Sequence, residues 1–189
     1  VGPGELHIPA IEGIGGSILY LVDRYGAKGS IYDIDFNFID KNQNTGAGLT
    51  YIDHLTHNVN RGQMATWADF YTNLFNFREI RYFDIEGKLT GLKSKAMTSP
   101  CGKIRIPINE SSDDKSQIEE FLKRYNGEGI QHIALGTNDI YTTVEILQKG
   151  GLEFQTTLDT YYAKVDKRVP NHGESLERMK KLNILVDGA

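Results

Sequence analysis

The sequence predicts an α+β protein built from βαβββ modules, in which a half-open barrel sheet carries helices on its outside. Three observations support this fold class. Over residues 49–110, strand-forming and amphipathic segments follow the order strand, helix and three strands. The same order begins again near residue 128. Each copy also has a histidine in the middle of its first strand, His54 in the first and His132 in the second.

The N-terminal part, residues 1–45, is predicted to be the end of one domain followed by a linker. Its Gly- and Pro-rich start indicates a loop. Two strands are expected at 16–23 and 31–39, the second because apolar and polar residues alternate there. The turn-rich stretch 40–48 favours a domain boundary, so that residues 46–189 form a second, catalytic domain.

The first module, at about residues 49–110, is expected to be complete. It opens with a strand over 49–59, which is rich in β-forming residues. A helix follows at 62–76, because its apolar residues recur at helical spacing. Short Gly-containing turns then separate three further strands, at 77–87, 89–100 and 102–110.

The second module, at about residues 128–189, is expected to be incomplete. An amphipathic helix at 115–125 leads into it. Residues 157–182 then interrupt the repeat with a mixed helical segment, and the remaining strands are absent or barely begun. The elements that repeat the first module are a strand at 129–137, a helix at 139–150 and a strand at 151–155.

The composition restricts the class of protein. The chain has 189 residues, a formal net charge of -4 and 39% hydrophobic residues, which is ordinary for a globular protein. No apolar run reaches the roughly 18 residues that cross a bilayer. Lysine and arginine are scattered, so neither a membrane nor a nucleic acid is expected as a partner. The single cysteine, Cys101, excludes an intrachain disulfide and a Cys-based zinc site and fits the cytoplasm.

Both ends of the sequence are unusual for a natural protein. It begins without methionine, in a Gly- and Pro-rich stretch. It ends with an apolar run and a turn, "ILVDGA", that leads into no further element. We therefore expect the chain to be a fragment of a longer protein.

The histidines of the two first strands are candidates for a metal site. A strand fixes the direction of its side chains, so an imidazole on a strand is a stiff ligand. Because His54 and His132 occupy equivalent places, a pseudo-two-fold axis would let both face one cavity. His57 lies three residues after His54 and must face the other side of the strand. A single histidine is more often a structural residue, but two in matched places favour a site.

Two histidines do not specify a metal. Adding one carboxylate gives the ligand set of non-haem Fe(II) oxygenases, and a catalytic zinc site would also need three protein ligands. The end of the first module's last strand, at Asn109, has its counterpart at about residue 187 or later. We therefore expect the third ligand beyond Ala189, while Asp187 is interpreted as a turn residue and Glu174 and Glu177 are the other acidic candidates inside the chain.

Several motifs resemble the 4-hydroxyphenylpyruvate dioxygenase family of the vicinal oxygen chelate superfamily. They run in order along almost the whole chain, and the combination of "PINE", "KSQI" and "GIQHIAL" is the most specific. The other motifs are "YIDHLTHNV", "LFNFREIRYFDI", "TGLKSKAM" and "ILVD". The resemblance implies Fe(II), with His54 and His132 as ligands and a glutamate beyond residue 189 as the third. It also implies that the full protein is a homo-oligomer. A chain of this length alone is expected to be inactive.

The same resemblance implies a reaction and a substrate site. The family converts 4-hydroxyphenylpyruvate and O2 to homogentisate and CO2 in tyrosine breakdown. The positions that match polar residues of its substrate pocket are Ser94, Asn109, Gln117 and Gln131. As polar side chains near the histidines they suit the orientation of a small polar ligand, although Gln117 alone is more typical of an ordinary helix start.

Three alternative functions fit the same fold. A hydroxymandelate synthase would share the iron ligands and the substrate but hydroxylate the side chain. A glyoxalase-type lyase would use zinc or nickel and take up no oxygen. A metal-free ligand-binding module would not need the paired histidines, which argue against it.

Overall fold

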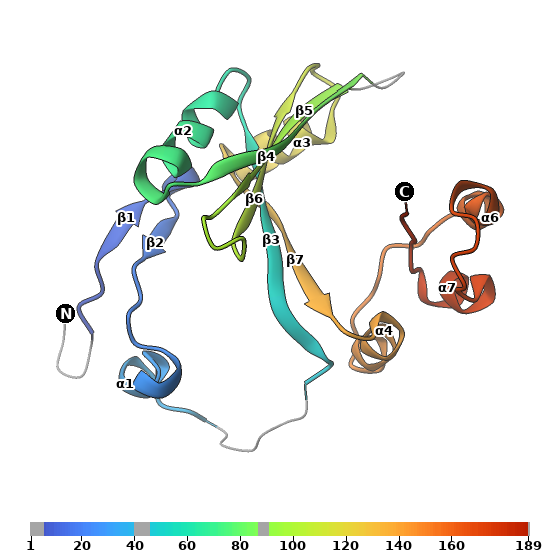
Figure 1. Ribbon diagram of the computed structural model, residues 1–189, viewed down its shortest axis with the longest axis horizontal. Helices are drawn as coiled ribbons and strands as arrows, with labels where there is room; N and C mark the ends of the chain where they lie inside the picture. Colours follow the sequence, from blue (N-terminus) through green and yellow to red (C-terminus); the bar gives the residue numbers. More distant parts are fainter. Residues whose placement is uncertain (1–5, 40–45, 87–90, 189) are drawn as a thin grey trace. The chain divides into compact units, whose positions relative to one another are not determined.

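The computed structural model of the protein describes residues 6–39, 46–86 and 91–188, and Figure 1 draws the rest of the chain as a thin grey trace. The first residues of the predicted N-terminal loop therefore lie outside the described residues. The same holds for most of the predicted linker and for the predicted turn after Glu86.

The chain separates into two compact units. The first comprises residues 1–43 and 52–134, and the second comprises residues 44–51 and 135–189. The domain division predicted from the sequence is a single cut at about residue 45, whereas each of these units combines two separate segments of the chain. The predicted division stays a prediction.

A five-stranded open sheet dominates the first unit, with the strand order β4-β5-β6-β3-β7 (Figure 1). β3 pairs in parallel with β6, and β5 pairs antiparallel with both β4 and β6. Along the chain the order is β3, α2, β4, β5 and β6, so the predicted βαβββ module is confirmed. The strands are β3 (Leu49–Val59), β4 (Arg78–Glu86), β5 (Gly91–Thr98), β6 (Arg105–Ser111) and β7 (Gly129–Thr137).

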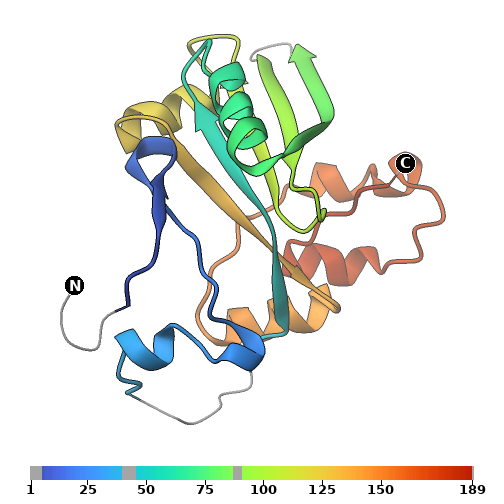
Figure 2. The same ribbon diagram turned by 60° about the vertical axis from the view of Figure 1, so that its left-hand side comes forward.

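Helix α2 (Met64–Phe75) packs on one face of this sheet (Figure 2). Its first free amide, that of Met64, donates to the Glu110 carboxylate of β6 at 3.1 Å, which supplies the acceptor that a helix start lacks. The helix ends at Asn76, which adopts the left-handed conformation with φ of 55°. The core between α2 and the sheet consists of Ile14, Val59, Ala68, Tyr71, Phe77, Met97, Ile106 and Ile108.

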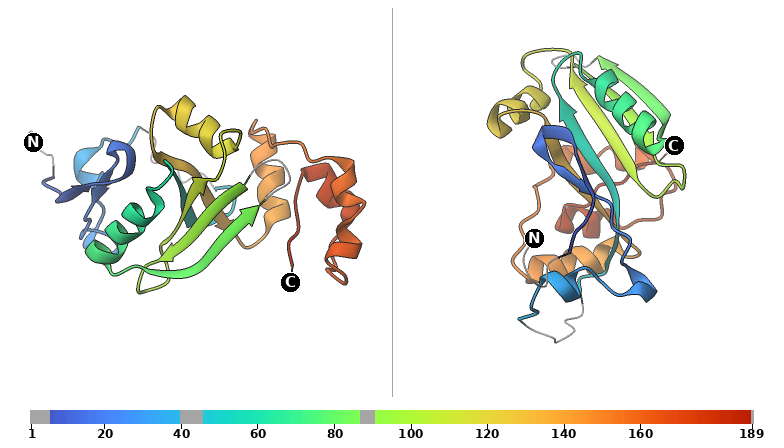
Figure 3. Two further views of the ribbon diagram at one scale, coloured as in Figure 1. Left: turned by 90° about the horizontal axis from the view of Figure 1, so that it is seen from above. Right: turned by 90° about the vertical axis from the view of Figure 1, so that its left-hand side faces the viewer.

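Helix α3 (Gln117–Tyr125) lies on the opposite face of the sheet from α2 (Figure 3). Ser116 caps it, since the serine hydroxyl accepts from the amide of Glu119. The hydroxyl of Ser111, at the end of β6, in turn donates to the Glu119 carboxylate. This contact fixes α3 over the end of the sheet face that carries the odd-numbered residues of β6.

The N-terminal segment forms a small hairpin instead of the predicted loop and strands. β1 (Ala10–Glu12) pairs antiparallel with β2 (Ile18–Tyr20). The 3-10 turn η1 (Ile14–Gly16) joins the two strands, and a second one, η2 (Gly26–Lys28), follows β2. The hairpin is anchored by Ile14, which is 1% exposed and joins the core under α2. Of the strand predicted at 16–23, only the three residues of β2 are extended and paired.

The strand predicted at 31–39 is wrong, because this stretch holds the short helix α1 (Tyr32–Asp35). Its polar side chains bond to nearby backbone. The Ser30 hydroxyl accepts from the amide of Tyr32, and the Asp33 carboxylate accepts from the amide of Ser30. Such local bonds offer the backbone an alternative to a strand ladder, which the alternating pattern alone does not reveal.

The second unit is helical. α4 packs against α7, and a small core forms around Tyr162, Val165 and Met179. The strand predicted at 151–155 is wrong: the described residues there form no strand, because the chain leaves α4 through a turn in which the amide of Leu152 donates to the carbonyl of Leu147. The mixed helical segment predicted at 157–182 is confirmed. The helices are α4 (Ile140–Lys149), α5 (Asp159–Tyr162), α6 (Val165–Arg168) and α7 (Leu176–Leu182).

No helix within the described ranges is both long enough and apolar enough to pass through a membrane.

Candidate metal centre

The two predicted ligands meet on the sheet face opposite α2. His54 lies in the middle of β3 and His132 in the neighbouring strand β7. Their Nε2 atoms are 3.3 Å apart, and the rings meet edge to face at 76°. The structure therefore brings together two histidines that are 78 positions apart in the sequence.

The outer nitrogens of both rings have acceptors that fix the position of the ring proton. The Asp53 carboxylate lies 2.8 Å from His54 Nδ1, and its other oxygen accepts from Arg105 at 2.7 Å. The amide oxygen of Gln131 accepts from His132 Nδ1. Because a carboxylate and an amide oxygen only accept, each Nδ1 carries a proton, and in the neutral form of each ring the lone pair lies on Nε2.

The surroundings of His132 favour its neutral form. Partial burial lowers its pKa, and the neighbouring His54 ring lowers the pKa further. The hydroxyl of Thr56, on the same face of β3 as His54, lies 3.0 Å from His132 Nε2 and donates to its lone pair. A neutral imidazole is the form that binds a metal ion.

This arrangement fits a metal ion. The two Nε2 atoms, 3.3 Å apart, are close enough to bind the same ion. Two imidazole ligands bind one metal at about 2.0–2.1 Å each, which at a right angle puts the two nitrogens roughly 3 Å apart. The residues present therefore suit two adjacent ligands of one ion, while their role as ligands stays a prediction.

The four residues predicted to bind substrate differ in their surroundings. Ser94 of β5 and Asn109 of β6 are direct partners in the sheet, and both are half-buried. Gln117, at the start of α3, is exposed. Gln131 is also exposed, and its side chain is engaged with His132. The structure thus pairs Ser94 with Asn109 and gives Gln131 a contact with a ligand candidate, and the binding roles stay predictions.

His57 faces the other side of β3, as the strand period predicts. It is 2% exposed and lies beneath α2, where its Nε2 is 2.7 Å from the hydroxyl of Tyr71. Burial lowers the pKa of His57 from 6.5 to about 4, so the ring is neutral near pH 7. Burial also raises the pKa of Tyr71 to about 12, so the phenol stays protonated and donates to His57.

Comparisons with known proteins agree with this arrangement. The model of the Glyoxalase/Bleomycin resistance protein/Dioxygenase superfamily matches residues 51–165, more than half of the chain, and this range includes both histidines. The chain belongs to this superfamily. The α+β fold class predicted from the sequence is therefore confirmed. A second model, described as the N-terminal part of hydroxyphenylpyruvate dioxygenase, matches residues 1–37 of this superfamily member.

Two curated relatives of this superfamily member are similar over its full length. The 4-hydroxyphenylpyruvate dioxygenase of Pseudomonas aeruginosa is 68% identical, and the match covers 98% of this chain and 52% of that protein. Hemolysin VllY of Vibrio vulnificus is 66% identical, with 100% of this chain and 54% of that protein covered. The chain thus spans about half the length of the curated relatives it matches.

The fold has a solved counterpart. A triple mutant of 4-hydroxymandelate synthase from Streptomyces coelicolor matches with a TM-score of 0.77 over 94% of this chain and 50% of that one. The two sequences are 22% identical, so this likeness supports the superfamily fold and carries no information about substrate.

A third protein ligand is not found in the described part of this superfamily member. Among the described residues, no group of three or more His, Cys, Asp or Glu side chains is arranged to hold a metal ion. The acidic residues considered from the sequence, Glu174, Glu177 and Asp187, are all exposed. Glu174 accepts from the hydroxyl of Tyr141 at 2.8 Å.

Three residues around the histidine pair were missed by the sequence prediction. Asp53 and Thr56 carry a signal in hindsight, since one directly precedes His54 and the other follows it by one strand period. Arg105 carries none, because it reaches Asp53 from another strand. Its place depends on the register of β6 against β3, which the sequence of either strand does not specify.

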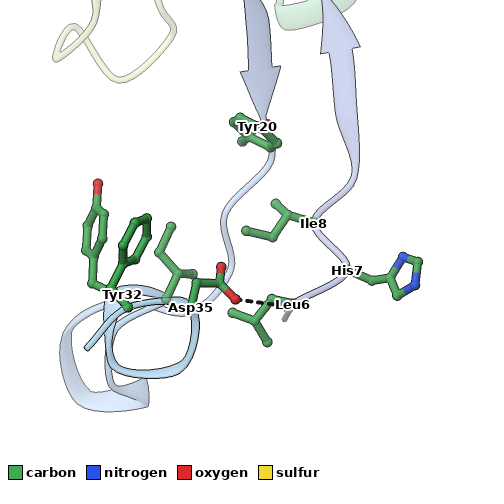
Figure 4. A pocket seen from close by; sticks show the side chains of 8 residues that line it. Leu6, His7, Ile8, Tyr20, Tyr32 and Asp35 are labelled. Atoms are coloured by element: carbon green, nitrogen blue, oxygen red, sulfur yellow. Dashed lines mark hydrogen bonds between the residues drawn. The ribbon is translucent and has the colours of Figure 1, made fainter. Parts of the chain in front are cut away.

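The N-terminal segment of this superfamily member lines a separate, open cavity of about 620 Å³ (Figure 4). In Figure 4 the Asp35 carboxylate accepts from the backbone amide of Leu6, at 2.8 Å, at the edge of this cavity. None of the predicted site residues lines it. Its lining residues are Leu6, His7, Ile8, Tyr20, Ile31, Tyr32, Asp35 and Phe36.

Proposed function

We propose that this chain is part of a 4-hydroxyphenylpyruvate dioxygenase. The reaction consumes one 4-hydroxyphenylpyruvate and one O2 and yields one homogentisate and one CO2. Superfamily membership and the 68% identity to a protein of that name support the proposal. The observation that carries it is the pair of imidazoles on neighbouring strands, His54 and His132, whose Nε2 atoms lie 3.3 Å apart.

In this proposal His54 and His132 hold an Fe(II) ion together with a glutamate that follows residue 189. Such an ion would supply open coordination positions for the 2-oxo acid group of the substrate and for dioxygen. The chain's own residues prepare the two ligands. Asp53 and Gln131 keep the ring protons on Nδ1, so that both Nε2 atoms stay free for the metal.

The substrate lies along the same sheet face in this proposal. Asn109 and Ser94 would orient its polar groups, since they are paired across β6 and β5. Gln131 and Gln117 complete the predicted set, one beside His132 and the other at the start of α3. Their proposed task is to bind and orient the ligand, so replacing Asn109 by alanine should impair turnover while metal binding largely survives. Gln131→Ala should also impair turnover, but it removes the acceptor of His132 Nδ1 and should therefore weaken metal binding as well.

The test is product analysis with the complete protein. Purified protein is loaded with Fe(II) without oxygen and then mixed with 4-hydroxyphenylpyruvate and O2. Oxygen uptake is followed with an electrode, and products are identified by mass spectrometry. We expect one homogentisate for each O2 consumed. A chain of residues 1–189 alone should show no turnover and bind Fe(II) weakly, because two imidazoles leave the ion short of ligands.

Other outcomes identify the alternatives. Hydroxymandelate as the product would mean a synthase that attacks the side chain. Zinc or nickel in the purified protein, without oxygen uptake, would mean a glyoxalase-type lyase. Binding of the substrate without any metal would mean a ligand-binding module. Turnover by the 189-residue chain alone would mean that Glu174, Glu177 or Asp187 completes the ligand set.

The remaining features of the proposed enzyme come from the sequence. We infer that it acts in the cytoplasm, in tyrosine breakdown, and as a homo-oligomer, with no nucleic acid as a partner. The single cysteine, Cys101, supports the location in the cytoplasm, and the scattered basic residues support the absence of a nucleic-acid partner. Size-exclusion chromatography with light scattering tests the oligomeric state.

A further inference from the structure

A buried amide on the metal-site face of β3 has no assigned role. Asn58 follows His54 by four residues and is 3% exposed. Its side-chain oxygen has no hydrogen-bond partner within the described part of the chain. A buried acceptor without a donor is unfavourable, so a native protein normally supplies it with a partner, such as an ordered water or a ligand.

The direction of Asn58 follows from the strand period. His54 and Thr56 both reach His132, so the even-numbered residues of this part of β3 face the histidine pair. Asn58 is the next residue of that row. His57, which lies between Thr56 and Asn58, and Val59, which follows Asn58, face the core under α2 instead.

The register of the sheet places Asn58 beside two residues already proposed for the substrate site. Asn58 of β3 is the direct partner of Asn109 in β6, and Asn109 is the partner of Ser94 in β5. These three polar side chains form a row across three strands. Four residues separate the row from His54, which corresponds to about 13 Å along a strand that rises roughly 3.3 Å per residue.

The proposed substrate has its polar groups at two opposite ends. The 2-oxo acid end offers only acceptors and suits the metal. The other end carries a phenol hydroxyl, which is the one hydrogen-bond donor of the ionised molecule. A ligand held by its 2-oxo acid near His54 and extended along β3 directs that hydroxyl toward the row of Ser94, Asn109 and Asn58.

We propose that Asn58 is a further substrate-binding residue, and that its amide oxygen accepts the hydrogen bond of the phenol hydroxyl. The inference rests on the proposed function and adds to it a residue that distinguishes hydroxylated from unhydroxylated aromatic 2-oxo acids. The phenol hydroxyl then supplies the buried oxygen of Asn58 with a donor that the described residues do not provide.

The test compares two ligands that differ by one hydroxyl. The complete protein, loaded with Fe(II) and kept without oxygen so that no turnover occurs, is titrated by calorimetry with 4-hydroxyphenylpyruvate and with phenylpyruvate. In Asn58→Leu, which has nearly the same shape, we expect about tenfold weaker binding of 4-hydroxyphenylpyruvate. Binding of phenylpyruvate should stay within about threefold of the unmodified protein. The exposed Asn60→Leu is the matched control and should change neither affinity.

The outcomes separate a substrate contact from a structural role. Equal weakening of both ligands, or of neither, in Asn58→Leu overturns the inference and leaves the proposed function standing. If Asn58→Leu does not fold, Asn58→Asp serves instead. The aspartate side chain retains an acceptor, so this variant should keep the preference for the hydroxylated ligand. Loss of the preference in Asn58→Asp would contradict the inference. Failure of the unmodified protein to bind 4-hydroxyphenylpyruvate overturns the proposed function and this inference together.

Discussion

The two faces of strand β3 carry histidines with opposite roles. On one face His54 is partly exposed, its outer nitrogen is bonded to a carboxylate, and its inner nitrogen faces His132. On the other face His57 is 2% exposed and bonded to Tyr71 under α2. The two residues are the same chemically and three positions apart. The difference shows that neighbouring residues of one strand can give the same side chain a partly exposed position beside a second histidine or a buried position in the core.

Substitution of the histidine on the metal-site face should have the largest effect, a loss of metal binding. His54→Ala should weaken Fe(II) binding by more than about 100-fold, because loss of a residue that merely supports a ligand already reduces affinity roughly 10- to 100-fold. Metal content after dialysis, and affinity by anaerobic titration with Fe(II), measure the effect in the complete protein.

His57→Gln is the matched variant on the opposite face. Glutamine retains a group able to bond to Tyr71, so metal affinity should change by less than about threefold. A loss of metal in His57→Gln similar to that in His54→Ala would contradict the division between the two faces.

The second effect is on the pH dependence of stability. The pKa of His57 is lowered to about 4 in the folded chain from 6.5, so the unfolded chain takes up a proton at higher pH than the folded chain. The stabilisation is therefore complete above pH 6.5 and is lost as the pH falls toward 4. One pKa unit corresponds to about 1.4 kcal/mol, so the loss amounts to about 3 kcal/mol.

Urea unfolding between pH 7.5 and 4 measures this dependence. Carboxylates also titrate in the lower part of that range, so the informative quantity is the difference between the unmodified protein and His57→Gln. The variant should lose about 3 kcal/mol less stability on acidification than the unmodified protein. Parallel curves for the two proteins would mean that His57 does not control the acid sensitivity.

The third effect concerns the residue behind His54. Asp53→Asn keeps a hydrogen-bond acceptor beside Nδ1 but removes the negative charge that raises the basicity of the ring. Fe(II) affinity should fall by about tenfold. Asp166→Asn is the control, since Asp166 forms an equivalent bond to His172 in the second unit. Equal effects of the two substitutions on metal affinity would argue against a specific role for Asp53.

Much of this site was predictable from the sequence. The repeat pairs His54 with His132, and the period of the strand places His54 and His57 on opposite faces. The sequence could not predict that Asp53 and Gln131 contact the ligand candidates, or that Arg105 bonds to Asp53, because such contacts depend on rotamers and on the register of neighbouring strands. It also could not predict the missing acceptor partner of Asn58, which depends on what covers that side chain.

The errors in the fold prediction have a common cause. Residues 31–39 and 151–155 have the alternation or the β-forming composition of strands, but neither is in a sheet ladder in the structure. At 31–39, local bonds from Ser30 and Asp33 satisfy the backbone instead. A short strand is stable only beside a partner strand, and a periodicity argument contains no information about the partner.

The smallest expected effect tests the buried side of β3 alone. Tyr71→Phe removes the hydroxyl that donates to His57 Nε2 at 2.7 Å and leaves the ring volume unchanged. The buried imidazole then lacks a donor, so the free energy of unfolding should fall by about 1 kcal/mol. Because Tyr71 lies across the sheet from the histidine pair, Fe(II) affinity should not change beyond the error of the titration. Urea unfolding at pH 7.5 and the anaerobic titration measure the two quantities on the same preparation. Tyr20→Phe, which removes an exposed hydroxyl, is the control and should change neither. A loss of metal in Tyr71→Phe without a loss of stability would mean that the two faces of β3 are coupled, and that His57 supports the metal site through the strand.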